Sequence, residues 1–167
     1  MERNRPVLAL WPATLARLVL GGVFVVAGLL KLPDPAAAVR AVRAYRLLPE
    51  ALVGPVAFGL PVLEIAVGVA LVAGVFVRTA AIASAVLLTV FVVAVGSAWA
   101  RGLQIDCGCF GNGGQVAAGD TAYPAEVARD VGLLIVALAL ARWPRSRLAL
   151  GHLITGPSTE KELSRAR

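Results

Sequence analysis

The chain has few of the side chains that usually carry metal or acid–base chemistry. Its 167 residues include two cysteines and one histidine, and only 16% are charged, against about 25% in average soluble domains. Two cysteine thiolates cannot complete the four-ligand shell of a structural zinc site. The single histidine, His152, lies in a polar C-terminal stretch, and the pattern gives it no role. Attention therefore falls on the cysteines.

Hydrophobic residues, in contrast, make up 59% of the chain, and the mean hydropathy is +0.81. Such a composition is typical of a membrane protein, and the length is enough for one small helical membrane domain. The net charge of +6 is carried by 14 arginines and two lysines, most of which flank apolar runs. Membrane topology and anionic lipid head groups explain this pattern better than nucleic acid does, so we expect no nucleic-acid partner.

Three apolar runs are each about long enough to cross a hydrocarbon core of ~30 Å, and a fourth has charged first turns before a shorter apolar centre at 131–141. We expect spans at about residues 12–31, 51–77, 80–100 and 124–143, with an N-terminal segment at 1–11 and a tail at 144–167. No small-x-small cleavage site follows the first run, so we interpret it as an uncleaved span and not a signal peptide. A very short turn at Arg78-Thr79 makes its flanking spans antiparallel neighbours. The prediction is an all-α membrane protein, with one domain at 12–143 built as an antiparallel bundle of four transmembrane helices.

Residues 36–48 predict a short amphipathic helix between the first two spans. Three arginines recur at every third position beside apolar residues: Arg40, Arg43 and Arg46, with Val39, Val42 and Tyr45. This pattern is typical of a helix that lies in the membrane interface.

The glycine-rich loop 102–123 joins the last two spans and holds Cys107 and Cys109. The intervening Gly108 gives the backbone freedom to bring the two sulfurs together. A disulfide in so small a ring should be strained and easily reduced, which suits a redox pair better than a permanent staple. Two alternatives remain at this stage. The cysteines could be buried structural residues, or they could hold Cu(I), which prefers soft thiolate ligands.

Four charged residues near the cysteines are candidate supporting groups. Glu126, Arg129 and Asp130 are spaced so that they can share one face of the last helix. Arg129 could lower a cysteine pKa or pair with Asp130, and the three could also be an ordinary head-group cluster. Asp106 precedes Cys107 and is either a proton acceptor or a solvated loop acid.

Two ionisable residues fall inside apolar runs, Arg17 in the first and Glu64 in the second. Charges within spans are costly, and they are usually paired or functional. We expect a buried Arg17–Glu64 ion pair, with a proton or quinone site as the alternative.

The distribution of basic residues predicts the orientation in the membrane. Nine lie on the side of the two termini: Arg3, Arg5, Arg78, Arg142, Arg145, Arg147, Lys161, Arg165 and Arg167. Six lie on the side of the cysteine loop: Lys31, Arg40, Arg43, Arg46, Arg101 and Arg129. Both termini are therefore expected in the cytoplasm and the cysteine loop outside it, in a compartment where disulfides form.

Several motifs together resemble the DoxX-like membrane proteins and, more narrowly, the MauE family linked to methylamine utilisation. They are Arg17 with Gly21 and Gly22, the stretches at 27–32, 45–49 and 61–68, the sequence Asp-Cys-Gly-Cys-Phe-Gly at 106–111, and Arg129-Asp130. The resemblance covers residues from about Leu15 to Trp143. It implies a four-helix bundle in the bacterial inner membrane and a part in disulfide formation or electron transfer, often beside a thioredoxin-like protein.

The sequence thus predicts a membrane thiol-disulfide redox protein in which one cysteine forms a mixed disulfide and the other resolves it. No second cysteine pair is present to pass electrons across the membrane. A membrane quinone or a thioredoxin-like protein is therefore the expected acceptor. Two alternatives stay open: a protein that handles Cu(I), and a non-enzymatic membrane partner of an oxidoreductase.

Overall fold

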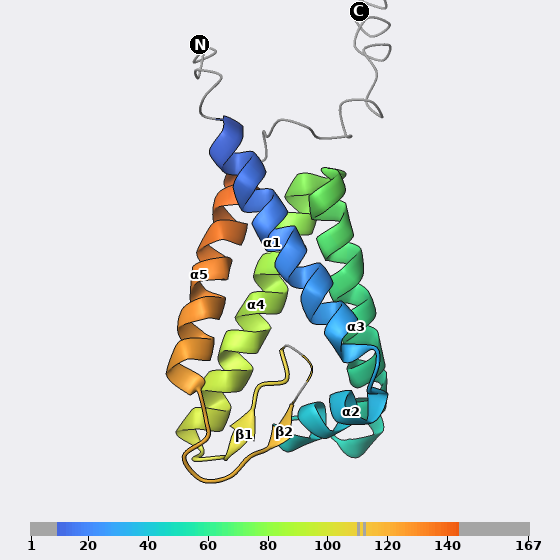
Figure 1. Cartoon of the computed structure of the whole chain (residues 1–167), viewed down its shortest axis with the longest axis vertical. Helices are drawn as coiled ribbons and strands as arrows, with labels where there is room; N and C mark the ends of the chain where they lie inside the picture. Colours follow the sequence, from blue (N-terminus) through green and yellow to red (C-terminus); the bar gives the residue numbers. More distant parts are fainter. Residues whose placement is uncertain (1–9, 110, 112, 144–167) are drawn as a thin grey trace, which may run out of the picture.

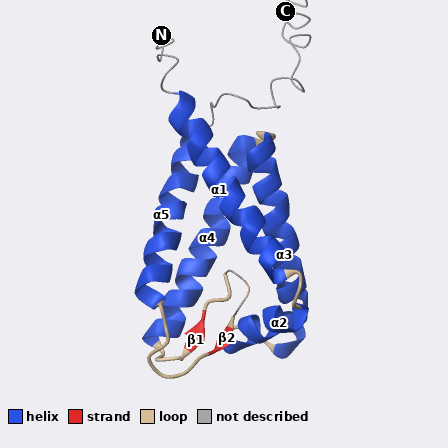
Figure 2. Ribbon diagram, viewed as in Figure 1, coloured by secondary structure: helices blue, strands red, loops and turns tan. Residues whose placement is uncertain are grey.

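The computed structural model describes residues 10–109, 111 and 113–143 (Figure 1). Its helices are α1 (Leu10–Lys31), α2 (Pro35–Ala44), α3 (Glu50–Ala73), α4 (Val77–Ala100) and α5 (Tyr123–Arg142). Two short strands between α4 and α5, β1 (Ile105–Asp106) and β2 (Gly114–Gln115), pair in antiparallel fashion with Asp106 opposite Gly114. The hairpin and α2 gather at one end of the long helices, and α1 begins and α5 ends at the other (Figure 2).

The long helices pack most extensively in two pairs, α1 with α3 and α4 with α5. Glycines allow close approach in the first pair: a Cβ on Gly21 would lie 2.9 Å from the carbonyl oxygen of Gly68, and a Cβ on Gly28 would lie 2.8 Å from that of Pro61. Small residues at helix contacts are typical of membrane bundles, where dispersion replaces the hydrophobic effect as the driving force. These contacts also fix the antiparallel register of α1 and α3.

In the described part of the chain, α3, α4 and residues Trp11–Lys31 of α1 are long and apolar enough to cross a membrane. Large apolar side chains such as Val62, Val90 and Ile135 are exposed on the outside of the bundle, which suits contact with lipid. The fourth long helix, α5, carries three charged residues in its first turns, at Glu126, Arg129 and Asp130. Three of the four expected spans are thus supported, and the fourth stays a prediction.

The amphipathic helix is shorter than expected, because α2 ends at Ala44 and not near residue 48. Asp34 caps its start by accepting a hydrogen bond from the backbone N–H of Ala37 at 2.8 Å. Arg46, two residues beyond the end of α2, has a left-handed backbone with φ of 52°, which prevents the helix from continuing. Ala37, Ala41 and Ala44 face inward, while the arginines at 40 and 43 are exposed.

The predicted turn at Arg78-Thr79 is wrong, because both residues lie within α4. The chain turns at residues 74–76. Gly74 has φ of 71°, its N–H bonds to the carbonyl of Leu71, and the N–H of Val75 bonds to that of Ala70. This is a Schellman termination, which favours glycine because the left-handed conformation strains other residues.

Candidate functional site

Cys107 and Cys109 lie in the apex of the β1–β2 hairpin, which turns back toward the helices and does not extend freely into solvent (Figure 1). The side chain of Asp106 begins the turn by accepting a hydrogen bond from the N–H of Gly108 at 2.9 Å. Gly108 has φ of +70°, and a Cβ there would lie 2.8 Å from the Cβ of Ala41 in α2. Both the backbone conformation and the packing therefore require glycine between the cysteines.

Two further glycines, Gly111 and Gly113, allow the part of the apex after the cysteines to pack closely against the helices. A Cβ on Gly113 would overlap both Ala41 and the backbone of Gly108. Gly111 has φ of +102°, and a Cβ there would lie 2.9 Å from the carbonyl oxygen of Leu30 at the end of α1. The apex is thus packed against α1 and α2, which gives the cysteines a defined position relative to the bundle.

The two cysteines are free thiols, each partly buried, and they contact one another. The backbone N–H of Cys109 donates to Sγ of Cys107 at 3.4 Å. Hydrogen bonding from the Cys109 side chain, with help from this N–H, lowers the pKa of Cys107. The same interaction and burial raise the pKa of Cys109. The pair therefore favours a thiolate at Cys107 over one at Cys109.

Tyr45, at the end of α2, holds the backbone of the pair. Its hydroxyl donates to the carbonyl of Cys107 at 3.0 Å, and burial raises its pKa, so the proton stays available for this bond. The carbonyl of Tyr45 in turn accepts from Nη2 of Arg101 at 2.6 Å, at the end of α4. The sequence pattern places Tyr45 on the amphipathic face and in the motif at 45–49, but nothing in the pattern relates it to the distant cysteines.

Glu126 is a buried carboxylate beside Cys107. It is 8% exposed, and its Oε1 accepts from the N–H of Cys107 at 3.5 Å. Its other oxygen, Oε2, has no hydrogen-bond partner among the described residues. The Glu126 charge opposes thiolate formation and so raises the pKa of Cys107, against the larger effect of Cys109. Potential ligand atoms of Asp106, Cys107 and Glu126 lie within 4.8 Å of one another, a set that could hold a metal ion.

Arg129 and Asp130 lie on the Cys109 side of the pair. Nε of Arg129 donates to Oδ1 of Asp130 at 2.9 Å, so the expected pairing of these neighbours is present. Asp130 is 3% exposed, and its Oδ2 has no partner among the described residues. Both residues line a small cavity together with Cys109. Glu126 and Asp130 are thus buried beside the cysteines, and Arg129, whose side chain is 33% exposed, lies at the edge of the same group.

The expected Arg17–Glu64 ion pair is wrong, because Glu64 pairs with Lys31. Nζ of Lys31 lies 2.6 Å from Oε1 and 2.7 Å from Oε2 of Glu64. Helical side chains lean toward the N-terminus of their helix. Since α1 and α3 are antiparallel, Lys31 and Glu64 lean toward each other, whereas Arg17 leans away from Glu64. Arg17 is buried elsewhere in the bundle, at 1% exposure.

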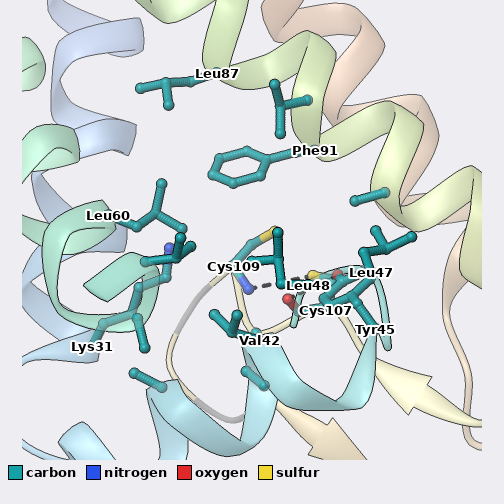
Figure 3. A pocket seen from close by; sticks show the side chains of 17 residues that line it. Lys31, Val42, Tyr45, Leu47, Leu48, Leu60, Leu87, Phe91, Cys107 and Cys109 are labelled. Carbon is teal, nitrogen blue, oxygen red and sulfur yellow. Dashed lines mark hydrogen bonds between the residues drawn. The ribbon is translucent and has the colours of Figure 1, made fainter. Parts of the chain in front are cut away.

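Two cavities adjoin Cys109, and Phe91 of α4 lines both. The larger, of about 220 Å³, lies between α3 and α4 and is bounded by α2 and the cysteine apex. In Figure 3 the Cys109 sulfur points toward the Phe91 ring, and Lys31 approaches from the opposite wall. The smaller, of about 30 Å³, connects Cys109 with Glu64, Arg129 and Asp130 and has room for about one water molecule.

Residues 9–143 match the family described as "Methylamine utilisation protein MauE". The chain belongs to the MauE family. It is 45% identical over 98 residues to a protein of Paracoccus denitrificans named "Methylamine utilization protein MauE". The aligned region covers 58% of this chain and 53% of that protein. It is 38% identical over 101 residues to a protein of the same name from Methylorubrum extorquens, covering 60% of this chain and 52% of that one.

The chain therefore spans about half the length of the curated MauE relatives it matches. No solved structure gives a significant match. The matched family range contains every candidate residue described above, from Arg17 to Asp130. Membership in the family confirms the resemblance read from the motifs at 106–111 and elsewhere.

Proposed function

We propose that this MauE-family protein is a membrane thiol-disulfide redox protein whose working group is Cys107 and Cys109. The observation that carries the proposal is the 3.4 Å hydrogen bond from the N–H of Cys109 to Sγ of Cys107. It brings the two residues into contact and favours a thiolate on one of them while the other keeps its proton. Thiol-disulfide exchange needs this combination, because only the thiolate attacks a disulfide sulfur.

The lowered pKa of Cys107 favours it as the attacking cysteine of the proposed mechanism. Cys107 attacks a disulfide of the partner protein, a mixed disulfide forms, and one partner sulfur leaves as a thiol. Cys109 then attacks Sγ of Cys107 and releases the second partner sulfur. The partner gains two electrons and two protons, and the pair becomes a disulfide. Disulfide formation in a partner uses the reverse sequence: a partner thiolate attacks Sγ of Cys107, Cys109 leaves as a thiol, and the second partner thiol then attacks the first partner sulfur and releases Cys107, so that the partner loses two electrons and two protons and the pair becomes a dithiol.

The membrane setting of the proposal is a four-span bundle with both termini in the cytoplasm. In this arrangement α5 is the fourth span, and its buried Glu126 and Asp130 lie inside the bundle, shielded from lipid. The arginine-bearing face of α2 lies at the outer surface of the bacterial inner membrane, where head groups can pair with it. The cysteine apex then faces a compartment in which disulfides persist.

The proposed partner is a thioredoxin-like protein that approaches the hairpin from the aqueous side. The two curated relatives carry methylamine utilisation in their names. By analogy, we propose that this chain is an accessory protein of methylamine utilisation, in which the cysteine pair would support disulfide formation in another protein.

Two alternatives give different results in the same experiment. A Cu(I) protein would hold the metal on Cys107 and Cys109, and a non-enzymatic partner would keep a structural disulfide. Thiols are alkylated in membranes before and after reduction, with and without copper. The proposal expects a disulfide that resists alkylation until it is reduced. Copper should make no difference to the alkylation of this oxidised form. Thiols that never oxidise and that copper protects would favour the metal instead.

A further inference from the structure

The larger cavity meets the cysteine pair within the apolar part of the protein. Its walls come from α3 and α4, with Leu60, Leu87 and Phe91 among the lining residues, and Cys107 and Cys109 form part of its boundary (Figure 3). An apolar cavity of about 150 Å³ can bind a benzene ring. A volume of about 220 Å³ is therefore enough for one substituted six-membered ring, but it is below the usual range for larger ligands.

The rim of this cavity faces the surroundings of the bundle. Leu47, Leu48, Val56 and Val90 line it, and each is also exposed, at 50%, 38%, 37% and 56%. In a membrane these side chains contact acyl chains. A ligand can therefore enter from the lipid and leave a long apolar chain outside the cavity.

One charged group lines the otherwise apolar wall. Lys31 is held by Glu64, and its Nζ lies 5.6 Å from the centre of the Phe91 ring. An ammonium group at this position can donate a hydrogen bond to a carbonyl oxygen on a bound ring. The cavity thus offers an apolar slot, one cationic donor and two thiols that together supply two electrons.

We propose that this cavity binds the ring of a lipid-soluble benzoquinone and that the Cys107–Cys109 dithiol is reoxidised there. The proposal rests on the function proposed above and adds the electron acceptor. Two S–H bonds break and one S–S bond forms, and the two electrons and two protons pass to the two quinone oxygens to give a quinol. The chain has only these two cysteines, so a two-electron acceptor at the pair itself completes the electron path.

The reaction is tested with the purified full-length protein in lipid nanodiscs, with decylubiquinone as the probe. The pair is reduced, the reductant is removed, and disulfide and quinol are measured together over time. Ala94→Phe and Leu60→Phe fill the cavity from opposite walls, on α4 and α3. Val93→Phe is the matched control, because Val93 adjoins Ala94 on α4 but is 64% exposed.

Wild type and Val93→Phe should form one quinol per disulfide, and both cavity variants should be slowed at least about tenfold, equivalent to ~1.4 kcal/mol in the barrier. All four proteins should exchange with dithiothreitol at similar rates, which shows that the pair stays reactive, and they should have similar thermal midpoints, which shows that the variants are folded. Unslowed cavity variants, or a wild type that exchanges with dithiothreitol but never reduces the quinone, would overturn the quinone site and leave the proposed function standing. Failure of wild type to exchange with dithiothreitol would overturn both.

Discussion

Lys31 and Glu64 form a buried ion pair between the end of α1 and the middle of α3, with Nζ 2.6 Å from Oε1. Their side chains are only 8% and 1% exposed, and both carboxylate oxygens accept from the same amine. The pair borders both cavities, since Lys31 lines the larger one and Glu64 the smaller. The ion pair therefore links the contact between α1 and α3 to the cavities that adjoin Cys109.

Removing one partner of this pair should be much worse than removing both. Breaking a buried ion pair costs about 3–5 kcal/mol, because the remaining charge is left buried, whereas apolar replacement of both partners can be nearly neutral. We expect Glu64→Leu and Lys31→Met each to lower the yield of folded protein and the thermal midpoint. The double variant should recover most of the loss.

The matched control is the exposed pair of Arg43 and Glu50, whose side chains are 53% and 69% exposed. Such pairs contribute about 0–1 kcal/mol, so Glu50→Gln should leave the thermal midpoint almost unchanged. A double Lys31–Glu64 variant no more stable than either single one would show that the two residues are not energetically coupled.

Replacing Gly108 by alanine should displace the cysteine apex from α2. The substitution combines a left-handed backbone with a contact of 2.8 Å to Ala41. The measurement is the rate at which maleimide labels the cysteines, which should rise as the apex moves outward. Gly102→Ala is the control, since Gly102 also has a left-handed φ of +65° but has nothing within 4 Å of an added Cβ. Equal labelling of both variants would mean that backbone strain, and not packing on α2, governs access.

The rate of alkylation of Cys107 should rise with pH, with a midpoint below the pKa of about 8.5 that is usual for a thiol. Hydrogen bonding from Cys109 lowers the pKa of Cys107, so the thiolate fraction rises at lower pH than in an isolated cysteine. Cys109→Ala should move the midpoint upward. Glu126→Gln should move it further down, because the carboxylate charge opposes the thiolate. Rates are measured with iodoacetamide by mass spectrometry, and shifts in the reverse directions would refute this electrostatic assignment.

Topology can be tested with reporter fusions. A reporter fused to the C-terminal tail should give the cytoplasmic signal, and one inserted within 112–120 should give the external signal. The expectation rests on nine basic residues on one side against six on the other. Reversed signals would place the cysteines in a reducing compartment and remove the physical basis for an exported disulfide.

The order of the helices could be predicted from the sequence because apolar runs and prolines mark them directly. Pro49 and Pro124 lie where α3 and α5 begin, as expected for proline near a helix N-terminus. The motif at 106–111 likewise singled out the loop that the helices enclose. The boundary at Gly74 does not follow from the sequence pattern, because the polar dipeptide Arg78-Thr79 indicates a turn more strongly than one glycine in an apolar run does.

The surroundings of the cysteines could not be predicted in the same way, since they depend on contacts between distant segments. Tyr45 is 62 residues from Cys107, and Lys31 is 33 residues from Glu64. The sequence pattern favours Arg17 over Lys31 as the partner of Glu64, because Arg17 lies inside the first apolar run and Lys31 lies at its end. The choice between Arg17 and Lys31 depends on helix direction and register, which no local pattern contains.

The central claim is tested most directly by measuring the redox state of the pair in native membranes. Alkylation and mass spectrometry should show Cys107 and Cys109 as one intramolecular disulfide that a mild dithiol reduces. Cys107→Ser and Cys109→Ser should keep the wild-type thermal midpoint, because the bridge closes almost no loop. Both should lose redox turnover, and Cys109→Ser should accumulate a mixed disulfide with its partner. Serine variants that stay fully active, or that both unfold, would contradict the account.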